Sequence, residues 1–423
     1  MTEPFDLSAW EPQYTSDPYP LVGKLRDTEP VSRVRVDGLA VWLVTGYDEV
    51  QQALLDPALR NDPAHAGPEA AATSWTGATR TEGIMRHMLR SDPPVHSRLR
   101  RLVSKAFTAR RVSDLRPRVE QIAQSLISDF AGEDHIDLVE RYAAPLPITV
   151  ISELFGVTLA DLDQFVYWAE IYAGIREGDT DKLPAAVAWL AGRLKELIAE
   201  CRAAAERPHA EDEPGRGEGT LIEALIGARD AGDRLNEDEL LAMAFLILVA
   251  GYETTVNLIA SGTWLLLSDP ERYAAISADR SLLGPAIEEC LRMESPVKVS
   301  AAVRYATKDT TVGDVRVSAG DAVLFHFGAA NRDPRRFADP DGFDWHRFDQ
   351  RTLTDGQAGA HLAFSHGLHY CLGAPLARLE AEIALTALMD TFPDLRLAEP
   401  GSQLAWRTSR IVRGLTSLPV TLH

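Results

Sequence analysis

The sequence predicts a mainly α-helical protein with a minor β region, organised around one long helix. Residues 240–250 are all apolar and lie between a polar start at Asn236 and a stop at Asp269-Pro270. A helix that is apolar nearly all round is expected to be buried. Short apolar or alternating segments bounded by turn residues occur within 31–44 and 311–325, and they predict the strands.

Composition indicates an ordinary globular protein. Of the 423 residues, 45% are hydrophobic and 25% are charged, which excludes wholesale disorder. A prior of about 150 residues per domain would give two or three domains. The most linker-like segment, 208–219, lies between two helical patterns and is expected to be a surface loop. We therefore expect one domain over residues 1–423.

The net charge and the cysteine content restrict the possible binding partners and the cellular compartment of the protein. The net charge of −19 disfavours nucleic acid as a global partner, because binding phosphate needs a dense basic surface. Three cysteines, Cys201, Cys290 and Cys371, exclude a disulfide framework and a four-cysteine metal site. No secretion signal is visible, and the longest apolar run is shorter than the ~20 residues that span a bilayer. We expect a cytoplasmic protein without membrane binding.

The first predicted element is a β-hairpin. Residues 31–36 alternate between apolar and polar, Asp37-Gly38 forms a turn, and residues 40–44 are apolar. Residues 96–270 are then expected to be nearly all helix apart from loops.

The central helix is the most regular of these elements. It begins at a capping box, in which Asn236 and Glu239 satisfy free backbone N–H groups, and it spans roughly 45–50 Å. Two further strands are predicted at 311–317 and 322–325, and helix returns after Gly373.

An acid and two hydroxyls interrupt the apolar part of the central helix. The segment reads Ala250-Gly251-Tyr252-Glu253-Thr254-Thr255. A threonine that bonds back to its own helix would explain Thr255. It would not explain a carboxylate in an apolar segment, because burying an unpaired charge is costly. We expect a flat ligand to lie against the small residues here, with Glu253 and Thr254 handling protons.

The strongest signal is the segment 364–373, with the pattern Phe-x-x-Gly-x-His-x-Cys-x-Gly. A helix start with proline follows it, and a helix N-terminus stabilises a thiolate. Glycine lets the backbone approach a flat partner closely. A lone cysteine is more often buried filler. A hydrolase using Cys371 and His369 is another alternative, but there is no nucleophile elbow and no evident partner acid. The pattern favours a ligating thiolate.

At this point the sequence resembles a known family. The segment 364–373 resembles the haem-thiolate loop of the cytochrome P450 mono-oxygenases, and the segment 250–255 resembles their oxygen-activation helix. Glu289 and Arg292 give the family's Glu-x-x-Arg, which Arg347 completes as a structural triad; a surface i,i+3 pair is the alternative. Segments 92–101 and 331–334 also match, so the resemblance covers nearly the whole chain.

The resemblance implies the roles of individual residues. Cys371 would ligate the iron of haem b, and a thiolate ligand favours O–O cleavage. Glu253 and Thr254 would be the acid–alcohol pair that delivers protons during oxygen activation. The other implied cofactor-binding residues are Phe364 and Gly373 beside the thiolate, and His96, Arg100, Arg304 and His369 at the haem propionates.

The resemblance also implies O2, an apolar small-molecule substrate, and a ferredoxin with its ferredoxin reductase as electron donors. Residues 98–118 contain eight basic residues against one acid. We expect this segment, with Arg378, to dock an acidic donor; an ordinary solvated helix face is the alternative. The chain is expected to be a monomer.

Substrate contacts are predicted in two groups, each of which has ordinary core packing as its alternative. The segment 61–90 is long, and long loops are often functional. Its candidates are Trp75, Met85 and Met88. The apolar candidates elsewhere are Phe245, Val249, Val297, Val299, Ile411 and Val412.

The sequence is similar to soluble actinobacterial members that tailor macrolides and other polyketides. This implies a mono-oxygenase that hydroxylates or epoxidises a bulky apolar secondary metabolite. A peroxide-driven or oxidative-coupling haem-thiolate enzyme and a non-catalytic haem-binding sensor or carrier are the alternatives. The Glu253–Thr254 pair argues against peroxide use, and a proton relay would have no purpose in a sensor or carrier.

Overall fold

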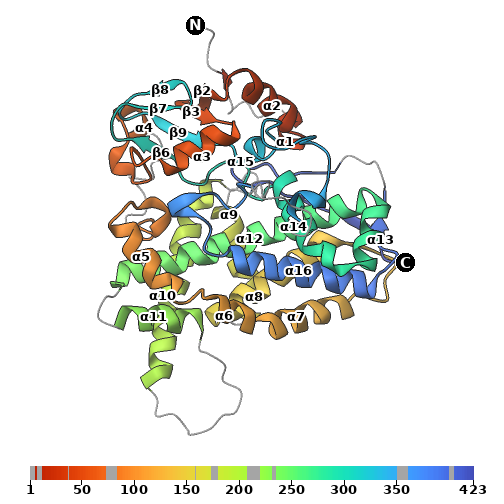
Figure 1. Cartoon of the computed structure of the whole chain (residues 1–423). Helices are drawn as coiled ribbons and strands as arrows, with labels where there is room; N and C mark the ends of the chain where they lie inside the picture. The colour runs from red at the N-terminus through yellow and green to blue at the C-terminus, as the bar shows by residue number, and fades with distance from the viewer. Residues whose placement is uncertain are drawn as a thin grey trace.

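The structure, a computed structural model, describes residues 5–6, 12–36, 38–72, 83–157, 159–172, 180–206, 220–230, 235–349, 361–399 and 404–423. The strands of the largest sheet gather at one end of the molecule, at the upper left of Figure 1, and helices make up most of the rest. The long helix α12 (Glu237–Leu267) crosses the middle. The predicted class, mainly α with a minor β region, is confirmed.

The elements follow one another in chain order. The other α-helices are α1 (Pro12–Ser16), α2 (Tyr19–Thr28), α3 (Tyr47–Leu55), α4 (Pro68–Ala71), α5 (Val95–Ser104), α6 (Ala109–Asp114), α7 (Arg116–Ser128), α8 (Pro145–Phe155), α9 (Leu159–Tyr172), α10 (Leu183–Glu206), α11 (Leu221–Asp230), α13 (Pro270–Ala278), α14 (Leu283–Met293), α15 (Phe327–Ala330) and α16 (Ala374–Thr391). Short 3₁₀ turns are η1 (Pro63–His65), η3 (Met88–Arg90), η5 (Thr180–Lys182), η6 (Arg280–Leu282), η7 (Trp345–Phe348) and η8 (Gly367–His369), and η4 (Val139–Ala143) is a π-helix. The strands are β1 (Phe5–Asp6), β2 (Val31–Val36), β3 (Leu39–Val44), β4 (Leu59–Arg60), β5 (His135–Asp137), β6 (Arg304–Ala306), β7 (Thr310–Val312), β8 (Val315–Val317), β9 (Ala322–Phe325), β10 (Arg396–Leu397) and β11 (Pro419–Thr421).

The largest sheet joins N-terminal strands to two strands from residues 304–325. Its strand order is β1-β2-β3-β9-β6-β4. The predicted hairpin is confirmed as β2–β3, with Val31 opposite Val44. Next to it, β9 runs parallel to β3 and sets Val41 opposite Ala322. This pairing brings a strand from beyond residue 320 beside the N-terminal hairpin.

The expectation of a single strand at 311–317 was wrong. Residues 310–312 and 315–317 form a separate tight hairpin, β7–β8, in which Val312 lies opposite Val315. The chain reverses at Gly313, whose φ of +55° is in the left-handed region that favours glycine. Valine and polar residues occur on both sides of this turn, so the segment resembled one strand in the sequence.

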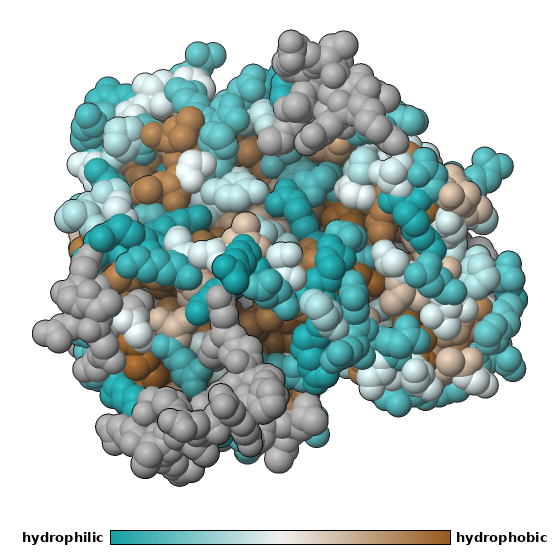
Figure 2. Space-filling model, turned by 60° about the horizontal axis from the view of Figure 1, so that its bottom comes forward, coloured by the Kyte–Doolittle hydropathy of each residue, from teal (hydrophilic) through white to brown (hydrophobic). Residues whose placement is uncertain are grey.

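The long helix α12 begins as the sequence predicts and is buried over most of its length. The side chain of Asn236 accepts from the Glu239 N–H, and the Glu239 carboxylate accepts from the Asn236 N–H, each at 2.9 Å. By length and composition alone, the whole helix α12 is long and apolar enough to cross a membrane, whereas the apolar run 240–250 is too short. However, 72% of the most apolar part of α12 is buried inside the protein. A core helix passes the same test. On the face in Figure 2, hydrophobic side chains form separate patches among hydrophilic ones.

The helices around α12 position the chemistry-bearing segments. α12 packs against α8, α10, α14 and α16. The predicted triad residues lie together beside α14: Glu289 and Arg292 are ion-paired at 2.7 Å, and Arg347 Nε lies 3.3 Å from the Glu289 carboxylate. The predicted loop at 208–219 lies outside the described residues.

Candidate active site

A cavity of about 290 Å³ lies between the middle of α12, α5, β6 and the loop that carries Cys371. Most of its wall is apolar, and its lining comes from segments between Leu54 and Glu380. The exposed surface of Cys371 faces this cavity. The fold therefore brings the cysteine motif and the small-residue turn of α12 to the wall of one cavity.

The Cys371 loop is held in a tight backbone conformation. The Cys371 N–H donates to the Phe364 carbonyl at 2.9 Å. Gly367 has a φ of +70°, in the left-handed region that favours glycine. The guanidinium of Arg378 lies 4.5 Å from the centre of the Phe364 ring.

Backbone groups at the start of α16 act on the Cys371 sulfur. Burial raises the pKa of the thiol, while hydrogen bonds from the backbone of Gly373 and Ala374 and the positive charge of Arg100 lower that pKa. These backbone N–H groups belong to the first turn of a helix, where no carbonyl of the same helix can accept from them. They are therefore placed to stabilise a thiolate.

Four basic side chains converge at another side of the cavity. His96 and Arg100 come from α5, Arg304 from β6 and His369 from η8, and all four line the cavity. The rings of His96 and His369 lie 4.3 Å apart. His96 is 1% exposed, and neither of its ring nitrogens has a hydrogen-bond partner among the described residues.

The electrostatics of this cluster favour an anionic partner. Burial lowers the pKa of His96, and the charges of Arg100 and Arg304 lower it further. Burial and the other three basic groups lower the pKa of His369 to about 3. Burial also lowers the pKa of Arg304 to about 10. Positive groups gathered in a recess repel one another, and a bound carboxylate would relieve that repulsion.

The middle of α12 forms the wall that carries the hydroxyl groups. Thr254 and Thr255 line the cavity and donate to the carbonyls of Ala250 and Gly251, at 3.0 and 3.4 Å. A Cβ at Gly251 would lie only 3.0 Å from the Ile151 side chain of α8. This close approach of two helices explains why residue 251 is small.

The predicted acid, Glu253, does not line the cavity. It lies on another face of α12, is 5% exposed, and its Oε1 has no hydrogen-bond partner among the described residues. Burial raises the pKa of Glu253 to about 8, although the charge of Arg407 lowers it. Near neutral pH its carboxyl group holds a proton one residue away from Thr254.

Comparison with known proteins decides the family. A family model described as Cytochrome P450 matches residues 13–395. The chain belongs to the cytochrome P450 family. It is 44% identical over 420 residues to cytochrome P450 107B1 of Saccharopolyspora erythraea, which covers 98% of this chain and 97% of that protein.

Two further P450s show the same similarity over nearly the whole chain. Mycinamicin IV hydroxylase/epoxidase of Micromonospora griseorubida is 40% identical over 401 residues, or 94% of each protein. The solved structure of the tirandamycin C-bound P450 monooxygenase TamI has a TM-score of 0.83 and 40% identity, and the match covers 99% of this chain and 100% of that one. The protein is thus a P450 mono-oxygenase, and enzymes of this kind use redox partners, O2 and organic substrates.

The residues around the cavity fit the haem iron that the family implies. Haem iron, when bound, supplies the chemistry that activates O2. The fit rests on two features of this chain. The Cys371 thiol faces the cavity and receives hydrogen bonds from backbone N–H groups at the start of α16. The buried His96, which also lines the cavity, has two ring nitrogens without partners among the described residues. These are the groups that an iron and its carboxylate-bearing macrocycle need.

The predicted substrate residues are only partly brought to this P450 cavity. Met88 and Val297 line it. Met85 accepts a hydrogen bond from Tyr172 at 3.4 Å, and Phe245 packs edge-on against the same ring. The other candidates lie elsewhere: Val249 packs in the helical core, Val299 in the core beside the sheet, Val412 is paired with Val297, Ile411 is 37% exposed, and Trp75 lies outside the described residues.

The spacing of the helix could have identified the correct face of α12. The lining residues are Leu246, Ile247, Ala250, Gly251, Thr254, Thr255 and Leu258. They lie three, four, seven or eight residues from Thr254 along the chain, or next to it, and so share one face of the helix. Phe245 and Val249 are also four apart, but they belong to a different face.

A second buried acid was not recognised from the sequence. Glu380 of α16 lines the cavity, is 2% exposed, and its Oε2 has no hydrogen-bond partner among the described residues. Burial raises its pKa well above the usual range. The signal is the same one that marked Glu253, namely an acid between apolar residues of a helix.

Proposed function

We propose that this P450 inserts one oxygen atom of O2 into a bulky apolar secondary metabolite of the macrolide or polyketide class, by hydroxylation or epoxidation. The observation that carries the proposal is a largely apolar cavity with the Cys371 thiol on one side and the Thr254 hydroxyl on another. The names of mycinamicin IV hydroxylase/epoxidase and of tirandamycin C-bound TamI support the substrate class. The cofactor is haem b, and the chain acts as a cytoplasmic monomer with one domain.

In this proposal the basic cluster holds the cofactor in one orientation. The side chains of His96, Arg100, Arg304 and His369 bind the two propionate carboxylates. Arg304 is itself fixed by donating from Nη1 to the Leu54 carbonyl at 2.8 Å. Backbone hydrogen bonds from Gly373 and Ala374 stabilise the thiolate form of Cys371 against the effect of burial, and Phe364 shields the sulfur from solvent.

The acid–alcohol pair moves protons. Glu253 holds a proton in an apolar surrounding, and the Thr254 hydroxyl, which donates to the Ala250 carbonyl, offers a proton-transfer site at the cavity wall. The apolar wall around Thr254 excludes other water, so protons arrive through this pair.

Electrons arrive from a ferredoxin, itself reduced by a ferredoxin reductase. Of the basic residues in 98–118, several have acidic partners: Arg98 with Glu239, Arg116 with Glu382, and Arg118 with Glu153. Arg378 is likewise bound to Glu288 at 2.6 Å. Lys105, at the end of α5, has an exposed side chain, as do Arg101 and Arg110, of which Arg110 lies 3.7 Å from the Asp114 carboxylate. We place the docking surface on this exposed side of α5, α6 and the turn between them, near Arg100, with Lys105 at its centre.

Two spectroscopic measurements and one turnover assay test this function. The reduced protein with carbon monoxide should show the red-shifted Soret band of a thiolate-ligated haem. Macrolides and linear polyketides should then shift the Soret band of the oxidised protein, and a ferredoxin system should convert the binders to products that carry one added oxygen atom. A Soret band without the red shift would exclude Cys371 as ligand, and binding by small polar metabolites alone would exclude the substrate class.

A further inference from the structure

A network of three side chains ties α14 to the start of α16, just beyond the Cys371 loop. Arg378 of α16 binds Glu288 of α14 through two hydrogen bonds: its Nε lies 2.6 Å from Oε1, and its Nη2 lies 2.7 Å from Oε2. The ring Nε2 of His361 lies 3.1 Å from the same Oε2. The His361, Glu288 and Arg378 side chains are 3%, 24% and 35% exposed, so the network lies at the edge of the interior.

The backbone fixes the part that His361 plays. Its Nδ1 accepts from the Ala363 N–H at 3.2 Å, so the hydrogen of the neutral ring is on Nε2 and is donated to Glu288. Burial raises the pKa of Glu288, but the hydrogen bonds from Arg378 and His361 outweigh burial and lower that pKa to about 2. Glu288 is therefore a carboxylate held by donors from two residues.

Glu288 holds the Arg378 guanidinium against the loop that carries Cys371. The guanidinium carbon lies 4.5 Å from the centre of the Phe364 ring, and Nη1 donates to the Tyr370 hydroxyl at 3.3 Å. Both rings belong to the Cys371 loop. Burial raises the pKa of the Cys371 thiol, and the positive charge of Arg378 is among the effects that lower it. The charge of Arg378 therefore stabilises negative charge on the sulfur.

This arrangement differs from the docking role expected for Arg378. An arginine bound to a carboxylate through two hydrogen bonds forms a pair without net charge, which attracts a distant acidic protein only weakly. At short range the two charges do not cancel, because the guanidinium itself lies against the Cys371 loop. The contacts of Arg378 thus point to an effect on Cys371.

We propose that Glu288 is a positioning residue that holds the charge of Arg378 beside the Cys371 loop and thereby raises the reduction potential of the haem. The proposal rests on Cys371 being the haem ligand. Reduction adds one electron, supplied by the ferredoxin, so the iron and its thiolate together carry one more negative charge. A fixed positive charge nearby stabilises the reduced state, and it does so more strongly at a partly buried site than in water.

Two other roles for Glu288 predict different results. If the network only ties α14 to α16, removing the Glu288 carboxylate lowers stability and leaves the potential unchanged. If Glu288 acts through its own negative charge, removing that charge makes the potential more positive. Positioning predicts the opposite sign, because the released guanidinium moves away from Phe364 into solvent.

The test is a dye-linked reductive titration of the haem-loaded full chain. Glutamine at position 288 cannot accept both guanidinium donors, so Glu288→Gln should make the potential more negative. At a fixed applied potential, the ratio of reduced to oxidised haem should fall by roughly three- to tenfold. Arg378→Met removes the charge and should shift the potential in the same direction. In the Arg378→Met background, Glu288→Gln should no longer lower the potential, because no guanidinium remains to be released.

Glu288→Asp separates position from charge, and it serves as the second variant if Glu288→Gln folds poorly. Aspartate keeps the negative charge but is one CH2 group shorter, so it cannot hold the guanidinium in the same place. The potential should become more negative by a smaller amount than in Glu288→Gln. An effect of charge alone predicts no shift in Glu288→Asp.

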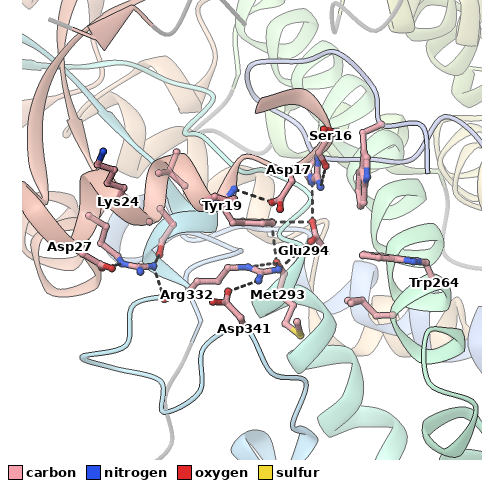
Figure 3. Close-up of a pocket in the computed structure, with 18 of the residues that line it drawn as sticks. Ser16, Asp17, Tyr19, Lys24, Asp27, Trp264, Met293, Glu294, Arg332 and Asp341 are labelled. Atoms are coloured by element: carbon pink, nitrogen blue, oxygen red, sulfur yellow. Dashed lines mark hydrogen bonds and ion pairs between the residues drawn. The ribbon is translucent and has the colours of Figure 1, made fainter. Parts of the chain in front are cut away.

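A similar ion pair away from the cavity provides the matched control. The guanidinium carbon of Arg332 lies 3.7 Å from the centre of the Tyr19 ring, and its Nη1 is bound to Asp341 at 2.7 Å. Figure 3 shows this pair at a surface pocket of about 930 Å³, and the residues given for its lining do not include any that line the cavity. Asp341→Asn makes the same change in charge as Glu288→Gln and should leave the potential unchanged.

The carbon monoxide spectrum separates this proposal from the proposed function. The unaltered protein and all variants should show the red-shifted Soret band after reduction, and its absence from the unaltered protein would exclude Cys371 as ligand. If the band is present, the potentials decide the role of Glu288. An unchanged or more positive potential in Glu288→Gln, or a shift of equal size in Asp341→Asn, would overturn the positioning role.

Discussion

Arg292 binds Glu289 through two hydrogen bonds inside the protein. Its Nε lies 2.7 Å from Oε2 and its Nη2 lies 2.8 Å from Oε1, and both side chains are 0% exposed. The remaining guanidinium N–H groups donate to the carbonyls of Asn331, Pro340 and Gly342. The pair therefore fixes α14 to two loops that are distant in sequence.

Arg292→Lys should lower the free energy of unfolding by about 3–5 kcal/mol, because lysine cannot replace the two-bond contact and leaves Glu289 partly unpaired in the interior. Urea unfolding of the haem-loaded protein measures this loss. The matched control is Arg347→Lys, since Arg347 is 14% exposed and contacts Glu289 only at 3.3 Å. It should cost about 1 kcal/mol or less, and equal losses in both variants would contradict the central role of Arg292.

The chemistry of the site could be predicted because it is local. The Cys371 loop and the turn at Glu253 are short motifs whose residue types make sense only near a ligand, and the capping box is set by two residues three positions apart, Asn236 and Glu239. The walls of the cavity could not be predicted in the same way. They depend on contacts such as the parallel pairing of β3 with β9, which joins Val41 to Ala322.

The sequence also could not show which face of each helix points toward the cavity. A helix that is apolar nearly all round gives no amphipathic signal, so Phe245 and Val249 were as plausible as Leu246 and Ile247 until the packing against α8 was known. Glu253 shows the same limit: the sequence marks it as a buried acid, but only the structure shows that it does not line the cavity.

Thr254→Ala should uncouple electron use from product formation. In the proposed relay the Thr254 hydroxyl at the cavity wall is the last proton-transfer group of the chain itself, so without it reduced oxygen should leave as hydrogen peroxide. We expect the ratio of product to NADPH to fall several-fold, with a much smaller change in the rate of NADPH use. The ratio is measured with the best-binding macrolide and a ferredoxin system.

Thr255→Ala is the matched control for this change. Thr255 lines the same cavity but donates to the Gly251 carbonyl at 3.4 Å and is 2% exposed. It should keep most of the coupling. If both alanine variants, or neither, lose coupling, Thr254 has no special role.

Glu253→Gln should make the stability of the protein less dependent on pH. The folded pKa of Glu253 is raised to about 8, above its ordinary value. The contribution of Glu253 to the free energy of unfolding is therefore fully present below the pKa of the unfolded state, and it is lost as pH rises through the pKa of the folded state. Glutamine cannot ionise, so the variant should be more stable than the unaltered protein at about pH 9, by on the order of a few kcal/mol.

Urea unfolding at about pH 5 and about pH 9 checks this sign. At the lower pH the two proteins should differ by less than about 1 kcal/mol. The charge of Arg407 lowers the pKa of Glu253 and so limits the dependence of stability on pH. Arg407→Leu, made with Glu253 intact, should therefore make stability more dependent on pH than it is in the parent protein. A variant that is less stable than the parent at the higher pH would mean that the Glu253 carboxylate is well solvated or paired.

Charge reversal at Lys105 should slow reduction of the haem by its electron donor. Lys105 is exposed at the end of α5, a short distance along the chain from Arg100, and the protein as a whole is strongly acidic. A local positive surface on such a protein is needed to attract an acidic donor, and its effect is on the association rate. Lys105→Glu should therefore reduce the second-order reduction rate by roughly tenfold at low salt, and by much less at high salt because ions screen exposed charges. Stopped-flow reduction by a ferredoxin at several salt concentrations measures both rates.

Lys195→Glu, at an exposed position on α10, is the matched control because it makes the same change in net charge. It should leave the reduction rate nearly unchanged. Equal slowing by the two variants would show that net charge, and not this surface, controls association.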